Sequence, residues 1–144
     1  MFMGEYNHSI DAKGRLIIPV RFREELGDEF VVTKGMDGCL YLYPFAAWKE
    51  FEEKLRNMPV TVNKESRKFA RFFMSGATTV ELDKQGRILI PPVLREFAGL
   101  TKNIVVTGVL DRVEVWDREK WLDYSQYDDM DEIAEHMSEI GFVL

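Results

Sequence analysis

The sequence predicts an α+β protein built from two copies of one β-hairpin unit, with helices on their flanks. Residues 11–19 read DAKGRLIIP and residues 83–91 read DKQGRILIP, so one motif occurs twice in the chain. Self-similarity of this kind is typical of a duplicated structural unit. Between the copies and after the second one, apolar residues recur at helical spacing. We therefore expect two related β units that share a core, with helical segments beside them.

The repeated motif predicts a tight turn that leads into a short strand. Each copy starts with Asp-x-x-Gly, at 11–14 and at 83–86, which is typical of a type I turn with Asp first and Gly fourth. The Asp side chain can bond the turn backbone, and Gly tolerates the positive φ at which the next strand begins. The apolar triplets 16–18 and 88–90 predict buried strands. A strand over residues 5–10 is expected before the first turn.

A helix and two further strands are expected after each of these units. Proline is favoured where a helix begins, and glycine where a helix ends. In the first copy these residues are Pro19 and Gly27. In the second copy they are Pro91 and Gly99. The further strands are expected at 29–34, 39–43, 103–108 and 112–116.

Three more helices are predicted outside the repeated units. The first ends before Pro59 and has an apolar face with Phe45, Trp48, Phe51 and Leu55. The second, near 64–75, places four basic side chains within an arc of about 100°, namely Lys64, Arg67, Lys68 and Arg71. The third, near 128–140, is acidic except for one side with Met130, Ile133, Ala134 and Met137. We expect the basic and the acidic helix to lie side by side, within one subunit or between neighbours.

The charge of the chain is unevenly distributed. The formal net charge is −6, but residues 117–144 alone carry nine acidic and two basic side chains. Residues 54–71 carry six basic side chains and one acidic side chain. Because charges act locally in salt solution, the acidic end does not exclude a nucleic-acid partner.

The cytoplasm is the expected compartment. No apolar run approaches the roughly 20 residues that span a bilayer, so no membrane association is expected. The first residues, MFMGE, lack the basic and apolar regions of a secretory signal. Cys39 is the single cysteine, which fits a reducing compartment, and we expect it in the core.

Arg15 and Arg87 are the candidate DNA-binding residues, because each one directly follows a repeated turn. A guanidinium is a planar fork of donors that suits bidentate contact with phosphate or with guanine O6 and N7. A two-stranded β-ribbon also fits the major groove of B-DNA. Lys13 and Lys84 project from the same hairpins and are candidates as well. The residues expected to shape the turns are Asp11, Gly14, Asp83 and Gly86.

A single copy of the motif has a structural alternative, in which the arginine only bridges to the aspartate across the turn. That alternative weakens when the motif occurs twice, because a turn needs Asp and Gly but does not need Arg. The recurrence of the arginine therefore favours contact with DNA.

The doubled D-x-x-G-R unit, followed by three aliphatic residues and Pro, resembles the AbrB-type swapped-hairpin motif. Two copies, together with the opening residues 4–11 that read GEYNHSID, resemble the MraZ family of bacterial transcriptional regulators over nearly the whole chain. The resemblance implies a β-rich swapped-hairpin barrel with flanking helices and ring-like homo-oligomers. It also implies binding to promoter DNA that contains short repeated boxes, at division and cell-wall genes.

The resemblance also suggests how the chain is divided. The two AbrB-like repeats are expected at 5–52 and 77–124, a connecting helical segment at 53–76, and an acidic C-terminal helix and tail at 125–144. The copies differ at the turn, where Lys13 becomes Gln85 and Ala12 becomes Lys84. Whether both hairpins contact DNA equally stays open.

Other kinds of site have little support. His8 and His136 are far apart in the sequence, and with one cysteine they form no set of metal ligands. No nucleophile motif or glycine-rich phosphate loop occurs. We expect no catalytic residue, no metal and no cofactor, and we predict that the chain is not an enzyme. The aromatic residues on the helices are expected to pack, and the basic helix to line DNA or to face solvent or another subunit.

The leading hypothesis is a sequence-specific DNA-binding transcriptional regulator, associated with the nucleoid, that binds direct repeats in double-stranded DNA as a homo-oligomer. The alternative is a structural or protein-interaction oligomer with no specific DNA target, whose hairpins bind an acidic partner protein.

Overall fold

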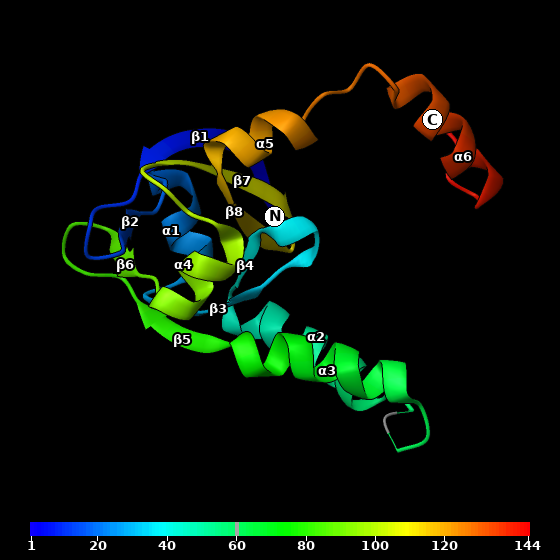
Figure 1. Cartoon of the computed structure of the whole chain (residues 1–144), viewed down its shortest axis with the longest axis horizontal. Coiled ribbons are helices and arrows are strands. Elements are labelled where there is room, and N and C mark those ends of the chain that lie inside the picture. The colour runs from blue at the N-terminus through cyan, green and yellow to red at the C-terminus, as the bar shows by residue number, and fades with distance from the viewer. Residues whose placement is uncertain (60) are drawn as a thin grey trace.

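The computed structural model describes residues 1–59 and 61–144 (Figure 1). Its strands are β1 (Phe2–Ser9), β2 (Arg15–Ile17), β3 (Glu29–Lys34), β4 (Leu40–Tyr43), β5 (Thr78–Glu81), β6 (Arg87–Leu89), β7 (Asn103–Leu110) and β8 (Arg112–Asp117). The six α-helices of the described residues are α1 (Val20–Leu26), α2 (Phe45–Arg56), α3 (Lys64–Gly76), α4 (Pro92–Ala98), α5 (Arg118–Tyr124) and α6 (Met130–Glu139). The predicted combination of strands and flanking helices is confirmed.

Six strands form one antiparallel sheet in the order β1-β7-β8-β4-β3-β5, and β2 and β6 form a separate two-stranded ribbon. Among the described residues β1 and β5 are the two edges of the sheet and do not pair with each other, so the predicted closed barrel is wrong. Both faces of the open sheet are covered. Neighbouring residues such as Val31 and Val32 point to opposite faces, and both are buried.

Each face of the sheet has its own hydrophobic cluster. On one face, the ribbon, α1 and α4 pack through residues such as Leu16, Phe22 and Leu94. On the other face, α2 and α3 pack through residues such as Trp48 and Phe73. The ribbon therefore lies on the side of the sheet opposite to α2 and α3.

Strands are exchanged between the two halves of the chain. The first strand of the first half, β1, pairs with β7 of the second half, and β5 of the second half pairs with β3 of the first. The ribbon likewise takes β2 from one half and β6 from the other, with Leu16 opposite Ile88. As expected, the two halves share one core, because neither half has a sheet of its own.

The predicted helices lie close to their expected positions. Pro19 precedes α1 and Gly27 follows it with a φ of 86°, while Pro91 and Gly99 flank α4 in the same way. The segments α2, α3 and α6 also lie where helical spacing predicted them. Helix α5 was not predicted, because its seven residues follow β8 directly and are too few to establish a helical period.

The expectations for the core are confirmed in most cases. Cys39 is fully buried, and this burial raises the pKa of its thiol far above the usual range. The predicted helical aromatic residues form ring contacts around Phe73 and Trp48, whereas Phe45 is exposed.

The basic and the acidic helix do not lie side by side within the chain. Figure 1 shows α6 at the end of a short connection that leaves α5, while α3 lies toward the opposite end of the molecule. Over the described residues, none of the helices has the length and apolar character needed to cross a membrane.

Candidate nucleic-acid interface

Both repeated turns have the same hydrogen bonds. In the first turn the Gly14 amide donates to the Asp11 carbonyl at 2.9 Å, and Asp11 Oδ1 accepts from the amides of Lys13 and Arg15 at 3.0 and 2.9 Å. Gly14 has a φ of 91°, which an L side chain adopts only with strain. The Arg15 amide, together with the Arg15 side chain, lowers the pKa of Asp11 below its ordinary value. Asp11 is therefore a charged acceptor at neutral pH.

The second turn repeats this geometry around Asp83. The Gly86 amide donates to the Asp83 carbonyl at 3.0 Å, and Asp83 Oδ1 accepts from the amides of Gln85 and Arg87, each at 2.9 Å. The Arg87 amide is again the main cause that lowers the pKa of Asp83. The two turns are thus equivalent in their backbone structure, although Lys84 takes a different position from Lys13 within the turn. Both lysines are exposed.

Each turn arginine forms an ion pair with the aspartate of its own turn. Arg15 Nε lies 2.6 Å from Asp11 Oδ2, and Arg87 Nε lies 2.8 Å from Asp83 Oδ2. The ion pair between arginine and aspartate across the turn, which the alternative to DNA contact predicted, is therefore present in both copies. It occupies Nε, however, and the terminal guanidinium nitrogens make no further bond to the described residues. The bridge orients each guanidinium through Nε, and the side chains of Arg15 and Arg87 stay 36% and 24% exposed.

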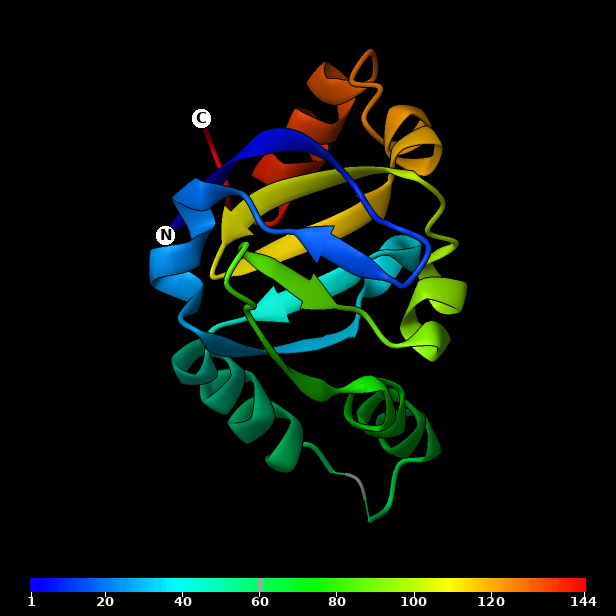
Figure 2. The same cartoon turned by 90° about the vertical axis from the view of Figure 1, so that its left-hand side faces the viewer.

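The two arginines lie on the outer face of the β2–β6 ribbon, which Figure 2 shows in front of the sheet. Arg15 is paired with Leu89, and Arg87 with Ile17, on either side of the buried central pair. Because side chains alternate along a strand, these four residues share the outer face. Ile17 and Leu89 are 37% and 58% exposed, so the prediction that both apolar triplets are wholly buried is wrong at their middle residues.

Two further arginines hold the turns, and each comes from the other half of the chain. Arg95 Nε donates to the carbonyl of Ile90 at 2.9 Å, and the Ile90 amide donates to the carbonyl of Gly14 at 2.9 Å. A Cβ on Gly14 would lie 2.7 Å from Arg95 Nε. The guanidinium of α4 therefore packs directly against the glycine of the first turn.

The second turn has the equivalent arrangement, with the two halves of the chain exchanged. Arg23 Nε donates to the carbonyl of Ile18 at 2.8 Å, the Ile18 amide donates to the carbonyl of Gly86 at 2.9 Å, and a Cβ on Gly86 would collide with the Arg23 guanidinium. Sequence reasoning assigned no role to Arg23 or Arg95. The signal was present, because Arg23-Glu24 and Arg95-Glu96 occupy the same place in the two copies.

Arg95→Ala is expected to loosen the first turn more than the second, although Arg95 lies in the second half of the chain. Loss of a hydrogen bond from a charged donor should lower the free energy of unfolding by about 1–3 kcal/mol. Amide relaxation measured by NMR should show increased motion at Gly14 and little change at Gly86. Arg21→Ala removes an exposed arginine of α1 and is the matched control. Equal effects on both turns would contradict this assignment.

The other candidate residues do not add a second site. His8 is half-buried on β1, where burial and the nearby Arg23 charge lower the pKa of its imidazole. His136 lies on α6, away from His8. No group of three or more potential metal ligands occurs in the part of the chain that the structure describes. Helix α3, which carries the basic residues, packs on the face of the sheet opposite to the ribbon.

Comparison with known proteins places the whole chain in one family. The family model for the MraZ protein, described as antitoxin-like, matches residues 1–72 and again residues 73–141. A protein of Lachnoclostridium phytofermentans is 59% identical over 98% of both chains, and one of Clostridium acetobutylicum is 56% identical over 98% of this chain and 99% of its own. A protein of Moorella thermoacetica is 58% identical over 95% of this chain and 96% of its own. All three are named transcriptional regulators, which agrees with the prediction of a regulator and not an enzyme, and the chain belongs to the MraZ family.

Proposed function

We infer that this protein is a transcriptional regulator that binds double-stranded DNA through the outer face of the β2–β6 ribbon. The observation that carries this inference is the pair of arginines, one from each half, that share this face with oriented and accessible guanidinium groups. The regulator names of the relatives support the same conclusion.

The chemistry of the ribbon suits sequence-specific contact in the major groove. Arg15 and Arg87 present the donor fork that pairs with guanine O6 and N7. Ile17 and Leu89 lie beside them and offer apolar contact to thymine methyl groups. Lys13 and Lys84 at the exposed turns contact phosphates, and Asp11, Gly14, Asp83 and Gly86 hold the turns in shape.

We further propose that the strand exchange is the swapped-hairpin arrangement of the AbrB type, with repeats at 5–52 and 77–124, a connecting helical segment at 53–76 and an acidic C-terminal segment at 125–144. The equivalent turns, helices and exchanged strands of the two halves support this division. On this account the protein acts in the cytoplasm, at the nucleoid, as a ring-like homo-oligomer at promoter repeats of division and cell-wall genes.

A ring made from head-to-tail contacts presents its subunits to DNA in the same sense, which favours direct repeats. We expect several short boxes spaced by about one helical turn, roughly 10 bp, so that each ribbon meets the same groove face. Affinity should rise steeply as boxes are added, because linked binding events reinforce one another. Insertion of about half a turn, roughly 5 bp, should remove that gain.

Gel shifts with duplexes of one to four boxes, selected from genomic fragments, measure these effects. Random duplex of the same length is the control. Full affinity for a single box, or a footprint centred on an inverted repeat, would contradict the direct-repeat arrangement. Equal affinity for selected and random duplex would favour the alternative, an interaction oligomer without a specific DNA target.

A further inference from the structure

Helix α6 has an apolar face that the rest of the chain leaves partly uncovered. Met130, Ile133, Ala134 and Met137 lie within an arc of about 100° on this helix. Met130 and Met137 are exposed. The opposite side carries the acidic residues Asp131, Glu132, Glu135 and Glu139. Figure 1 shows the helix standing apart from the sheet. An amphipathic helix in this situation needs a partner surface to bury its apolar face.

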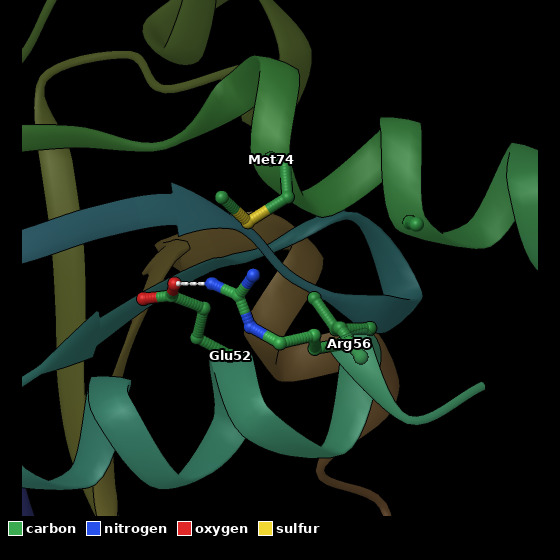
Figure 3. Close-up of a pocket in the computed structure, with 5 residues that line it drawn as sticks. Glu52, Arg56 and Met74 are labelled. Carbon is green, nitrogen blue, oxygen red and sulfur yellow. Dashed lines mark hydrogen bonds and ion pairs between the residues drawn. The ribbon is translucent and has the colours of Figure 1, made fainter. Parts of the chain in front are cut away.

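A cavity of about 280 Å³ lies between α2 and α3, and we call it the α2–α3 groove (Figure 3). It is lined by Glu52, Leu55, Arg56, Ala70 and Met74. Leu55, Ala70 and Met74 make its surface apolar. Glu52 and Arg56 form an ion pair of 2.8 Å along one side, with Met74 across from them. The groove is thus an apolar channel between two helices with a polar rim.

The charges beside the groove are opposite to those of α6. At about 100° per residue, Arg71 and Lys64 lie next to the line of Ala70 and Met74 on the surface of α3. Within the described residues, Lys64, Lys68 and Arg71 make no ion pair, and neither do the acidic side chains of α6. Both surfaces therefore carry charges without an ion-pair partner, and the positive charge of α3 is complementary to the negative charge of α6.

The helix and the groove of one chain do not meet. Helix α5, from which the connection to α6 departs, packs through Trp121 on the same face of the sheet as α2 and α3, but over β7 and β8. In both views the connection leads α6 away from α2 and α3 (Figures 1 and 2). In this arrangement the groove is open to the helix of another copy.

We propose that α6 of one subunit docks into the α2–α3 groove of a second copy of the chain. The apolar face of α6 covers Leu55, Ala70 and Met74, and its acidic side faces Lys64 and Arg71. Because helix and groove are different surfaces, the contact is heterologous and repeats from subunit to subunit until a ring closes. This inference rests on the proposed homo-oligomer and names the surfaces that form it.

DNA is a less suitable occupant of this surface. The groove is apolar and lies on the face of the sheet opposite to the ribbon with its two turn arginines. A duplex bound along the ribbon does not reach it. On this account the basic side of α3 binds an acidic helix.

Met137→Glu on the helix and Met74→Glu in the groove test the proposal in the full-length protein without DNA. Both side chains are accessible, at 38% and 45% exposed, so the fold should survive, which circular dichroism and thermal melting check. Light scattering should show that each variant loses the large assembly of the parent protein. Met3→Glu, an exposed methionine on β1, is the matched control and should keep the assembly.

A mixture of the two variants gives a sharper result. The Met74→Glu chain keeps an intact helix, and the Met137→Glu chain keeps an intact groove. One helix can therefore dock into one groove, and the mixture should form complexes of two chains and no larger species. Unchanged assembly in both single variants would overturn the proposal, and so would a mixture that stays as separate chains.

Charge reversal tests the electrostatic part. Lys64→Glu together with Arg71→Glu should weaken self-association at least tenfold, and Asp131→Lys with Glu135→Lys in the same chain should restore it. If the first pair leaves assembly unchanged and only lowers DNA affinity, α3 belongs to the DNA path and the proposal is wrong. Subunit mass is measured without DNA, so this failure is distinct from a failure of the proposed function, which would appear as loss of box preference in the parent protein.

Discussion

Arg15→Ala is expected to abolish specific DNA binding while the fold stays intact. Each lost base contact should cost about 1–3 kcal/mol of binding free energy, and a multivalent oligomer multiplies that loss. The free energy of unfolding should change by less than about 1 kcal/mol, because an exposed ion pair such as Arg15–Asp11 contributes little. Fluorescence anisotropy with labelled boxes measures the affinity, and thermal melting checks the fold.

Two further variants separate charge from geometry. Arg118→Ala removes an equal charge from the exposed surface of α5 and should leave specific binding nearly unchanged. Arg15→Lys keeps the charge but lacks the planar fork, so it should retain weak binding with reduced box preference. Normal affinity in Arg15→Ala with normal melting would rule out the first turn as a DNA contact. Arg87→Ala tests the second turn in the same way.

Ile88→Ala is expected to destabilise both halves of the molecule together. Ile88 is almost fully buried opposite Leu16 at the centre of the ribbon, so its truncation removes contacts with the other half. Truncation of a buried aliphatic side chain costs about 2–5 kcal/mol. Urea denaturation followed by circular dichroism should show one transition at a lower midpoint.

The neighbouring residue provides the control for this prediction. Leu89 is in the same strand but points outward, and Leu89→Ala should change the free energy of unfolding by about 0.5 kcal/mol or less. Two separate transitions in Ile88→Ala would contradict the shared core, because one half would then unfold without the other.

Local features of the fold could be predicted because they depend on local chemistry. The aspartate and glycine of each turn, the proline before α1 and α4, and the glycine after them are signals read within a few residues. The same signals located Arg15 and Arg87. Duplication strengthened each of them, because a residue that recurs without being needed for the turn points to another role.

Features that depend on pairing across the chain could not be predicted. No local sequence pattern predicts that β1 pairs with β7, or that Leu16 lies opposite Ile88 in the ribbon. The open sheet and the exposure of Ile17 and Leu89 follow from that pairing. The roles of Arg23 and Arg95 also follow from it, since each holds a turn of the other half.

Site-specific crosslinking to DNA tests most directly whether the ribbon is the DNA-binding surface. Cys39 is fully buried, so a thiol-reactive photocrosslinker should label only an introduced cysteine. Lys13→Cys and Lys84→Cys place the label at the exposed turns, and Lys68→Cys places it on the basic side of α3. With a duplex of direct repeats, both turn positions should crosslink to the boxes and the α3 position should not. Crosslinks from the α3 position and none from either turn would contradict the account.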